Sequence, residues 1–204
     1  MPIVDHAARL ITCKLVLYGP GRSGKTTNLT WLHAALPSSQ VGALTSVATR
    51  HGRTHAFEYR PDESAVVGAF RVGFEVRTMS GEARSSAARE ALLEGADGVA
   101  FIADSQRDRA SDNLASLQEV YRILSLQSVD AHILPMVLQY NKQDLPLEER
   151  WSPAEMARQL NARALIEVPA QACHGIGVRE TVEALSTRVL AHLGVRSPTL
   201  RWAA

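Results

Sequence analysis

Four features are scarce or missing in this sequence of 204 residues, and each absence narrows what the chain can be. It has only two cysteines, Cys13 and Cys173, which lie far apart in the sequence. This argues against a protein held together by disulfides and favours one that resides in a reducing compartment, the cytoplasm. The formal net charge of +1 argues against a field that would attract nucleic acid or an anionic membrane. No apolar run approaches the ~20 residues of a membrane-spanning helix. The two ends match no signal peptide, myristoylation or prenylation motif, so we expect no transmembrane segment and no lipid anchor.

What the sequence does contain describes a globular protein. Hydrophobic residues make up 46% of the chain and charged residues 21%, which provides apolar material for a real core. We find no internal repeat, low-complexity segment or dividing linker, and this length suits one domain. The sequence therefore predicts a single domain over residues 1–193 and a tail over residues 194–204.

The most informative stretch is residues 19–26, GPGRSGKT, which match the pattern G-x-x-x-x-G-K-[ST] of phosphate-binding loops. A β-prone run precedes it, and apolar residues at helical spacing follow it as far as Pro37. The order of strand, glycine-rich loop and helix favours a phosphate site over an ordinary glycine-rich turn. In this geometry the backbone N–H groups at the start of the helix point at a bound phosphate. Lys25 would reach the β- and γ-phosphates, and the Thr26 hydroxyl would ligate Mg²⁺. The predicted phosphate-binding residues are Gly19, Gly21, Arg22, Ser23, Gly24, Lys25, Thr26 and Thr27.

Strands and helices alternate along the rest of the chain. Alternating patterns predict an antiparallel hairpin from residues 55–59 and 69–76, and a continuous apolar run predicts a strand covered on both faces at 98–103. Residues 37–53 show no clear period and are expected to form a mobile loop. Further strands are expected at 133–140 and 164–168, with helices around 87–93, 114–124, from Ser152 onward and around 182–189. The result is an α/β fold in three layers, with a mostly parallel sheet that has one antiparallel strand, and the ligand beyond the carboxyl ends of the strands.

The base of the nucleotide is indicated by residues 141–144, NKQD, which follow a predicted buried strand and match the guanine motif N-K-x-D. The Asp144 carboxylate would accept hydrogen bonds from the ring N–H and exocyclic amine of guanine, which adenine does not offer there. Lys142 would lay its stem along the base and reach back to the phosphate loop, and Asn141 would hold the two loops together. The alternative, a polar capping turn, is disfavoured by the order of the two motifs. Ala170 and Gln171 lie where a third base-contacting loop belongs.

Together these residues resemble the Ras-like small GTPase superfamily, and within it the bacterial MglA-type branch. The similarity extends from about residue 11 to about residue 193. It rests on KLVLYGPG at residues 14–21 with GKTTNL at 24–29, SVAT at 46–49 with RT at 53–54, GV at 98–99 with ADSQ at 103–106, and QYNKQDLP at 139–146. The resemblance implies a Ras-like P-loop NTPase fold and a GTP/GDP switch with Mg²⁺, which in that family sets cell polarity and directs motility machinery. It also implies a dimeric roadblock-type activating partner, MglB in that family, and effectors that read the GTP state.

The resemblance also assigns residues of the two switch regions. Thr54 lies where the second hydroxyl ligand of Mg²⁺ belongs, and the alternative is a β-branched residue that opens a strand. Gly81 would offer its backbone N–H to the γ-phosphate. Most Ras-like proteins have an aspartate where Thr78 stands, and the MglA branch looks like it has a threonine, which implies less negative charge around the metal.

Arg53 resembles the intrinsic arginine finger of the MglA type, which swings to the phosphates when the partner remodels the switch. A guanidinium in that position contributes roughly 10³–10⁵ in rate in systems of this kind. The alternative is a solvated surface arginine. Arg22 and Arg50 are rival cations that the family resemblance does not support.

Glu82 is the main departure from the family pattern, because the residue after Gly81 is normally a glutamine that orients the attacking water. An ionised glutamate donates nothing to the γ-phosphate and adds negative charge beside an anionic transition state. The sequence therefore predicts slow hydrolysis, unless burial keeps Glu82 protonated or the alignment is off by one residue. Three functions stay open: a slow GTPase switch, a nucleotide-locked interaction module with negligible turnover, and an ATP-using enzyme, which residues 141–144 argue against.

The remaining special residues are not expected to carry chemistry. The histidines have no metal-like spacing, and Cys173 with His174 is too little for a zinc site. Trp202, in the predicted tail, is expected either to mark a contact site or to fold back onto the domain.

Overall fold

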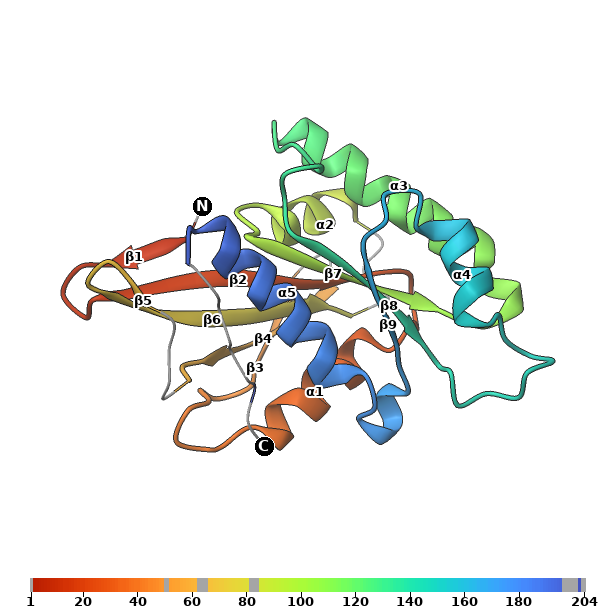
Figure 1. Cartoon of the computed structure of the whole chain (residues 1–204), viewed down its shortest axis with the longest axis horizontal. Coiled ribbons are helices and arrows are strands. Elements are labelled where there is room, and N and C mark those ends of the chain that lie inside the picture. Colours follow the sequence, from red (N-terminus) through yellow and green to blue (C-terminus); the bar gives the residue numbers. More distant parts are fainter. Residues whose placement is uncertain (1, 50–51, 62–65, 81–84, 196–201, 203–204) are drawn as a thin grey trace.

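The structure is a computed structural model, and it describes residues 2–49, 52–61, 66–80, 85–195 and 202. A central mixed β-sheet lies between helices on both faces, which makes three layers (Figure 1). The strands are β1 (Ile3–Asp5), β2 (Leu10–Tyr18), β3 (Thr45–Thr49), β4 (Gly52–Tyr59), β5 (Val66–Val67), β6 (Phe70–Met79), β7 (Gly98–Asp104), β8 (Met136–Asn141) and β9 (Ile166–Pro169). The helices are α1 (Lys25–Ala35), α2 (Ser86–Leu93), α3 (Ala110–Leu126), α4 (Pro153–Leu160) and α5 (Val178–His192), with 3₁₀ turns η1 (Arg107–Arg109) and η2 (Ala172–His174).

The order of strands across the sheet is β3-β4-β6-β2-β7-β8-β9, with β1 paired to β2 and β5 paired to β6. Strands β6, β2, β7, β8 and β9 run parallel to one another, and β4 runs antiparallel to β6. This arrangement confirms the predicted mostly parallel α/β fold. The antiparallel content is larger than predicted, because β1, β3 and β5 also form antiparallel pairs.

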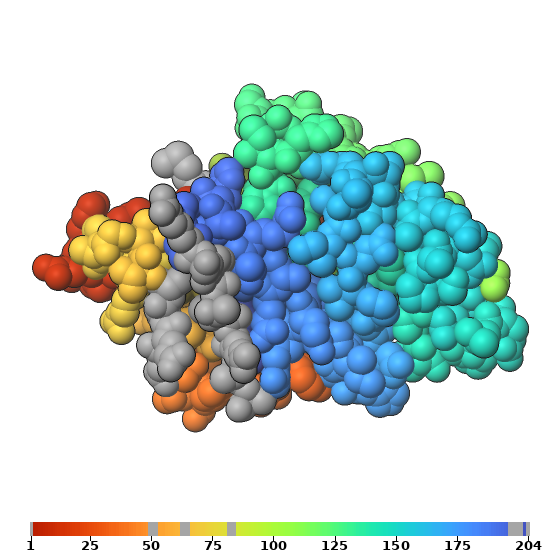
Figure 2. Space-filling model, in the orientation of Figure 1, coloured from red at the N-terminus to blue at the C-terminus, as the bar shows by residue number. Residues whose placement is uncertain are grey.

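Alternation along β2 divides the apolar core into two halves. Cys13, Leu15 and Leu17 pack in the cluster that contains α1 and α5, whereas Val16 and Tyr18 pack in the cluster that contains α2 and α3. Strands β7 and β8 are buried along their whole length, as expected for strands covered on both faces. In Figure 2 the dark blue α5 crosses one face of the molecule, with the teal segment around α4 to its right. Among the described residues, no helix combines the length and the apolar character needed to cross a membrane.

The prediction of a loop over residues 37–53 is wrong for residues 45–49, which form β3, and for residues 52 and 53, which begin β4. Strand β3 pairs antiparallel with β4, and Val41 makes an isolated bridge to Tyr59. Residues 45–48 are exposed, so no alternation between buried and exposed positions marks this edge strand in the sequence. Its stability comes from pairing with β4, which sequence patterning does not reveal.

Two other local predictions are confirmed. Residues 55–59 and 69–76 do pair antiparallel, with Tyr59 opposite Phe74. Helix α4 begins with the expected cap: the Ser152 hydroxyl accepts a hydrogen bond from the Glu155 N–H, and the Glu155 carboxylate accepts one from the Ser152 N–H. Pro153 occupies the first turn, where its missing N–H costs nothing.

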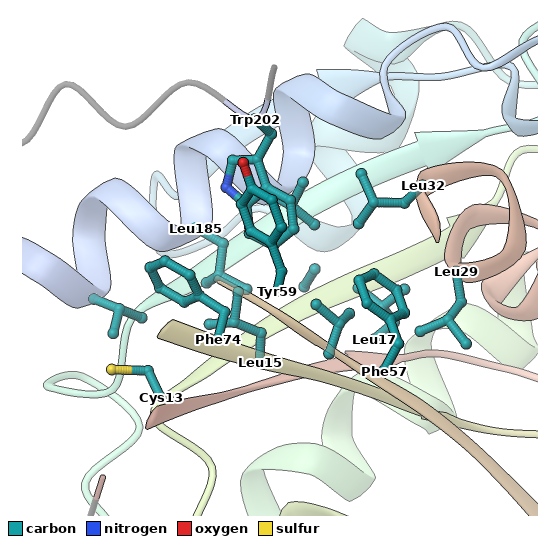
Figure 3. Packing of buried hydrophobic residues seen from close by; sticks show 14 of the residues in the cluster. Cys13, Leu15, Leu17, Leu29, Leu32, Phe57, Tyr59, Phe74, Leu185 and Trp202 are labelled. Atoms are coloured by element: carbon teal, nitrogen blue, oxygen red, sulfur yellow. The ribbon is translucent and has the colours of Figure 1, made fainter. Parts of the chain in front are cut away.

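Trp202 lies in the segment predicted as a tail, and it is fully buried (Figure 3). Its ring stacks on Tyr59 with ring centroids 4.3 Å apart and lies 5.6 Å from the ring of Phe74. The indole N–H donates to Ser186 Oγ (3.1 Å), and the backbone N–H donates to Glu183 Oε1 (2.9 Å). Of the two expectations for Trp202, folding back is the one confirmed; the boundary at residue 193 stays a prediction.

Candidate functional site

The predicted phosphate loop connects the end of β2 to the start of α1. Because α1 begins at Lys25, the N–H groups of its first turn have no acceptor within the helix. Gly19 and Gly24 have φ angles of 149° and 95°, a region that favours glycine. A Cβ atom at Gly19 would lie 2.2 Å from the Ile102 carbonyl oxygen, and one at Gly24 would lie 2.2 Å from Asn141 Nδ2. The close curvature of this loop therefore requires glycine at both points.

Two side chains of the loop are buried in a way that suits an anion. Lys25 is 7% exposed, and its Nζ donates to the carbonyl oxygens of Gly19 (2.9 Å) and Pro20 (2.6 Å). Burial lowers the pKa of Lys25 to about 8. Ser23 Oγ is buried and has no hydrogen-bond partner among the described residues. A phosphate in the loop would supply acceptors to the helix start and to the lysine, so the residues present fit this group.

A cavity of about 1030 Å³ opens in front of the loop. Arg53 and His55 of β4, Ser80 after β6 and Arg109 of η1 line its other walls. The structure thus brings these predicted residues together at one cavity: Gly21, Arg22, Gly24, Lys25, Thr26, Thr27 and Arg53. Residues of the phosphate loop and Arg53 of the predicted first switch therefore line the same cavity.

The two predicted first-switch residues lie differently. Arg53 is exposed, and its guanidinium donates to Ser46 Oγ on β3 (3.4 Å), while its carbonyl oxygen accepts from the Ser80 N–H (2.8 Å). Thr54 falls between Arg53 and His55, which both line the cavity, so it faces the other side of β4. In this arrangement Arg53 is near the phosphate loop and Thr54 is turned away from it.

Residues of the predicted second switch are only partly described. Thr78 is fully buried, and its hydroxyl donates to the Leu17 carbonyl oxygen of β2 (2.9 Å), so this threonine makes a contact within the sheet. Gly81, Glu82 and the rival cation Arg50 lie outside the described residues. Their predicted roles stay predictions.

Asn141 joins the loops that the sequence assigns to phosphate and base. It is 3% exposed, its Nδ2 donates to the Ser23 carbonyl oxygen (2.8 Å), and its Oδ1 accepts from the Ala172 N–H (2.9 Å). The Ala170 carbonyl oxygen accepts in turn from the Gln143 N–H (2.9 Å). One side chain therefore fixes the phosphate loop, the N-K-x-D loop and the third loop to a common edge of the sheet.

The Lys142 ammonium donates its hydrogen bonds to residues outside the phosphate loop, so the predicted link from Lys142 back to that loop stays a prediction. Its Nζ donates to Asp104 Oδ2 (2.6 Å) and to Gln106 Oε1 (2.7 Å). Arg109 makes the link instead: its Nη2 donates to the Gly21 carbonyl oxygen (2.8 Å), and its Nε lies 3.9 Å from Asp104 Oδ2. Sequence reasoning missed this role of Asp104, although a carboxylate at the end of a continuous apolar run is a pattern that indicates it.

Asp144 is exposed beside η2, at the other end of the site. Gln171 begins the adjoining loop, with its N–H donating to the Ile176 carbonyl oxygen (2.9 Å). The ligand atoms of Asp144, Cys173 and His174 all lie within 4.8 Å of one another. The sequence does not reveal this grouping, because Asp144 and the other two residues lie on different loops.

A glycine-lined phosphate loop and an N-K-x-D loop at the carboxyl edge of a mostly parallel, three-layer sheet define the class of Ras-like P-loop GTPases. The chain is 37% identical over 193 residues to the mutual gliding-motility protein MglA of Myxococcus xanthus (strain DK1622), and the match covers 95% of this chain and 98% of that protein. The chain belongs to the MglA-type small GTPases. A scan against protein-family models gave no match.

Proposed function

We propose that this protein is a GTP/GDP switch that binds guanine nucleotide with Mg²⁺ and acts in the control of cell polarity or motility. The observation that carries the proposal is the pair of hydrogen bonds made by Asn141, which hold the phosphate loop and the loop of Asp144 at one edge of the sheet. The relative is named for gliding motility, and identity along nearly the whole chain supports a role of the same kind.

The binding residues divide between the two ends of the nucleotide. Lys25 and the free N–H groups of the first turn of α1 would hold the phosphates, and Asp144 would read guanine. Thr26 lines the cavity and would ligate Mg²⁺, which would neutralise charge on the phosphates. Thr54 would join this set only after β4 presents its other face, which is the kind of γ-phosphate-dependent ordering that a switch needs.

Turnover is proposed to be slow, with Arg53 supplying catalysis when a partner is bound. The Arg53 guanidinium donates to Ser46 Oγ on β3 and would give up this hydrogen bond to bind a phosphate. A roadblock-type dimer that binds along this edge of the sheet would break that contact. Glu82, in place of glutamine, would keep hydrolysis slow until then, and Gly81 would sense the γ-phosphate. Until the partner binds, effector proteins would read the long-lived GTP state.

Nucleotide analysis tests the binding half of the proposal. The purified protein should release GDP or GTP on denaturation and should bind both again in the presence of Mg²⁺. Lys25→Ala should lose binding, whereas Arg158→Ala, an exposed arginine on α4, should bind as the wild type does. Release of an adenine nucleotide, or no measurable binding of guanine nucleotides, would contradict the proposal.

Single-turnover GTP hydrolysis tests the catalytic half. Glu82→Gln should hydrolyse GTP at least about tenfold faster than the wild type, because the amide can both accept from the water and donate to the γ-phosphate. An unchanged rate removes Glu82 from the mechanism. Glu82 also favours a second candidate, a nucleotide-locked interaction module, and bound GTP that is not turned over even with a roadblock-domain dimer would establish it.

A further inference from the structure

A carboxylate, a thiol and an imidazole meet at the guanine end of the proposed nucleotide site. Asp144 follows β8, and Cys173 and His174 end η2. Their ligand atoms lie within 4.8 Å of one another, all three side chains are exposed, and the Cys173 thiol is free. Oxygen, sulfur and nitrogen ligands in this combination are those that Zn²⁺ and related transition ions take in proteins.

The spacing of two of these ligands already matches a tetrahedral metal site. Cys173 Sγ and His174 Nδ1 are 3.5 Å apart. With bonds of ~2.3 Å to sulfur and ~2.0 Å to nitrogen, two ligand atoms of a tetrahedral Zn²⁺ also lie about 3.5 Å apart. A thiol–imidazole hydrogen bond gives the same spacing, so Asp144, as a third ligand from another loop, is what makes the cluster a site.

The backbone that carries these ligands is fixed from several sides. The Ala172 N–H donates to Asn141 Oδ1 (2.9 Å), which ties the start of η2 to the end of β8, close to Asp144. After η2, Gly175 has a φ angle of 76°, and a Cβ atom there would lie 2.0 Å from the ring of Trp31. Cys173 and His174 therefore sit on a turn whose backbone is constrained on both sides.

We propose that Asp144, Cys173 and His174 bind one Zn²⁺ or similar transition ion in the nucleotide-free protein, with water as the fourth ligand, and that this ion and guanine nucleotide exclude each other. The exclusion rests on the proposed function, in which the Asp144 carboxylate accepts two hydrogen bonds from guanine. A carboxylate bound to the metal cannot also accept both of them. Mg²⁺ prefers oxygen ligands and stays at the phosphate end, so the two ions do not compete. The transition ion would thus slow reloading of the empty switch.

Co²⁺ titration of the nucleotide-free protein under reducing conditions tests the metal site directly. The wild type should develop thiolate-to-Co²⁺ charge-transfer absorption that saturates at one ion per chain and is abolished by added Zn²⁺. Cys173→Ser should lose this absorption and His174→Gln should weaken binding at least tenfold, while both bind GDP as the wild type does. His132→Gln, an exposed histidine in the loop before β8, is the matched control and should bind Co²⁺ unchanged. No absorption with the wild type, or full absorption with Cys173→Ser, would overturn the site.

Competition is measured separately with GDP and Mg²⁺ present. At free Zn²⁺ ten times its dissociation constant, the apparent affinity for GDP should fall about tenfold in the wild type and stay constant in Cys173→Ser. Equal Zn²⁺ binding with and without saturating GDP would overturn the exclusion. A protein that shows the Co²⁺ absorption but binds no guanine nucleotide would overturn the proposed function, and the exclusion with it, and would leave the metal site standing.

Discussion

Lys25 is an ammonium group held in a site that is unfavourable for charge until an anion arrives. Burial lowers its pKa from 10.5 to about 8, so the folded, nucleotide-free protein releases this proton at a lower pH than the unfolded chain does. Between those values the unfolded chain binds more protons, and the free energy of unfolding therefore rises with pH. The full pKa shift corresponds to about 3 kcal/mol of unfolding free energy. The nucleotide-free protein is destabilised by this amount below pH 8, and the destabilisation disappears as the pH rises toward 10.5. Urea denaturation of the nucleotide-free protein across this range measures the rise.

Other groups also titrate in that window, so the comparison variant is Lys25→Met, which keeps much of the side-chain volume and has no proton to lose. The difference in unfolding free energy between wild type and variant should change between pH 8 and pH 10.5 by a large part of the ~3 kcal/mol. Parallel curves would show that Lys25 is not buried as a charge. Bound phosphates favour the ammonium form, so GDP affinity of the wild type should fall as pH rises above 8.

At the scale of helices and strands, the sequence predicted those elements whose formation depends on local residue patterns. The buried strands, the helices and the Ser152 cap follow from periodicity and cap chemistry, because those forces act within a few residues. The exposed edge strand β3 could not be predicted from such a local pattern, because it is stabilised by hydrogen bonds to β4. In the candidate site, the motifs placed Asn141 correctly between two loops. They did not predict that Lys142 donates to Asp104, because that carboxylate comes from the neighbouring strand β7.

Asp104 connects several elements at the carboxyl edge of the sheet. Its carboxylate accepts from Lys142 and faces Arg109, while the Asn113 side chain of α3 bonds to its backbone N–H and carbonyl oxygen. Asp104→Asn should therefore destabilise the fold by about 2 kcal/mol, less than for a fully buried pair because Lys142 and Arg109 are partly exposed. GDP affinity should fall as well, because Lys142 loses the group that orients it. Urea denaturation at pH 7 and GDP titration measure the two effects.

The matched control is Asp112→Asn, which removes the other carboxylate paired with Arg109. The Asp112 side chain is 48% exposed, so its loss should cost less than about 1 kcal/mol and leave GDP affinity unchanged. Equal costs for the two substitutions would contradict a special role for the buried carboxylate.

For the molecule as a whole, Trp202 connects the end of the sequence to the strand that carries the first switch. Its ring stacks on Tyr59 at the end of β4, and Arg53 and Thr54 lie near the beginning of the same strand. Trp202→Ala removes a fully buried side chain and should lower the free energy of unfolding by about 3–5 kcal/mol. Trp202→Phe keeps the stacking and loses the hydrogen bond to Ser186, so about 1–2 kcal/mol is expected.

Chemical denaturation of the two variants, with amide hydrogen exchange along β4, measures whether this connection matters for the switch strand. Exchange in β4 should become faster in Trp202→Ala, because Tyr59 loses the ring that covers it, while β8, which lies away from this contact across the sheet, should change less. If Trp202→Ala stays within about 1 kcal/mol of the wild type, Trp202 is not part of the core in solution. If stability falls but exchange in β4 is unchanged, Trp202 contributes to stability without influencing the strand that carries Arg53.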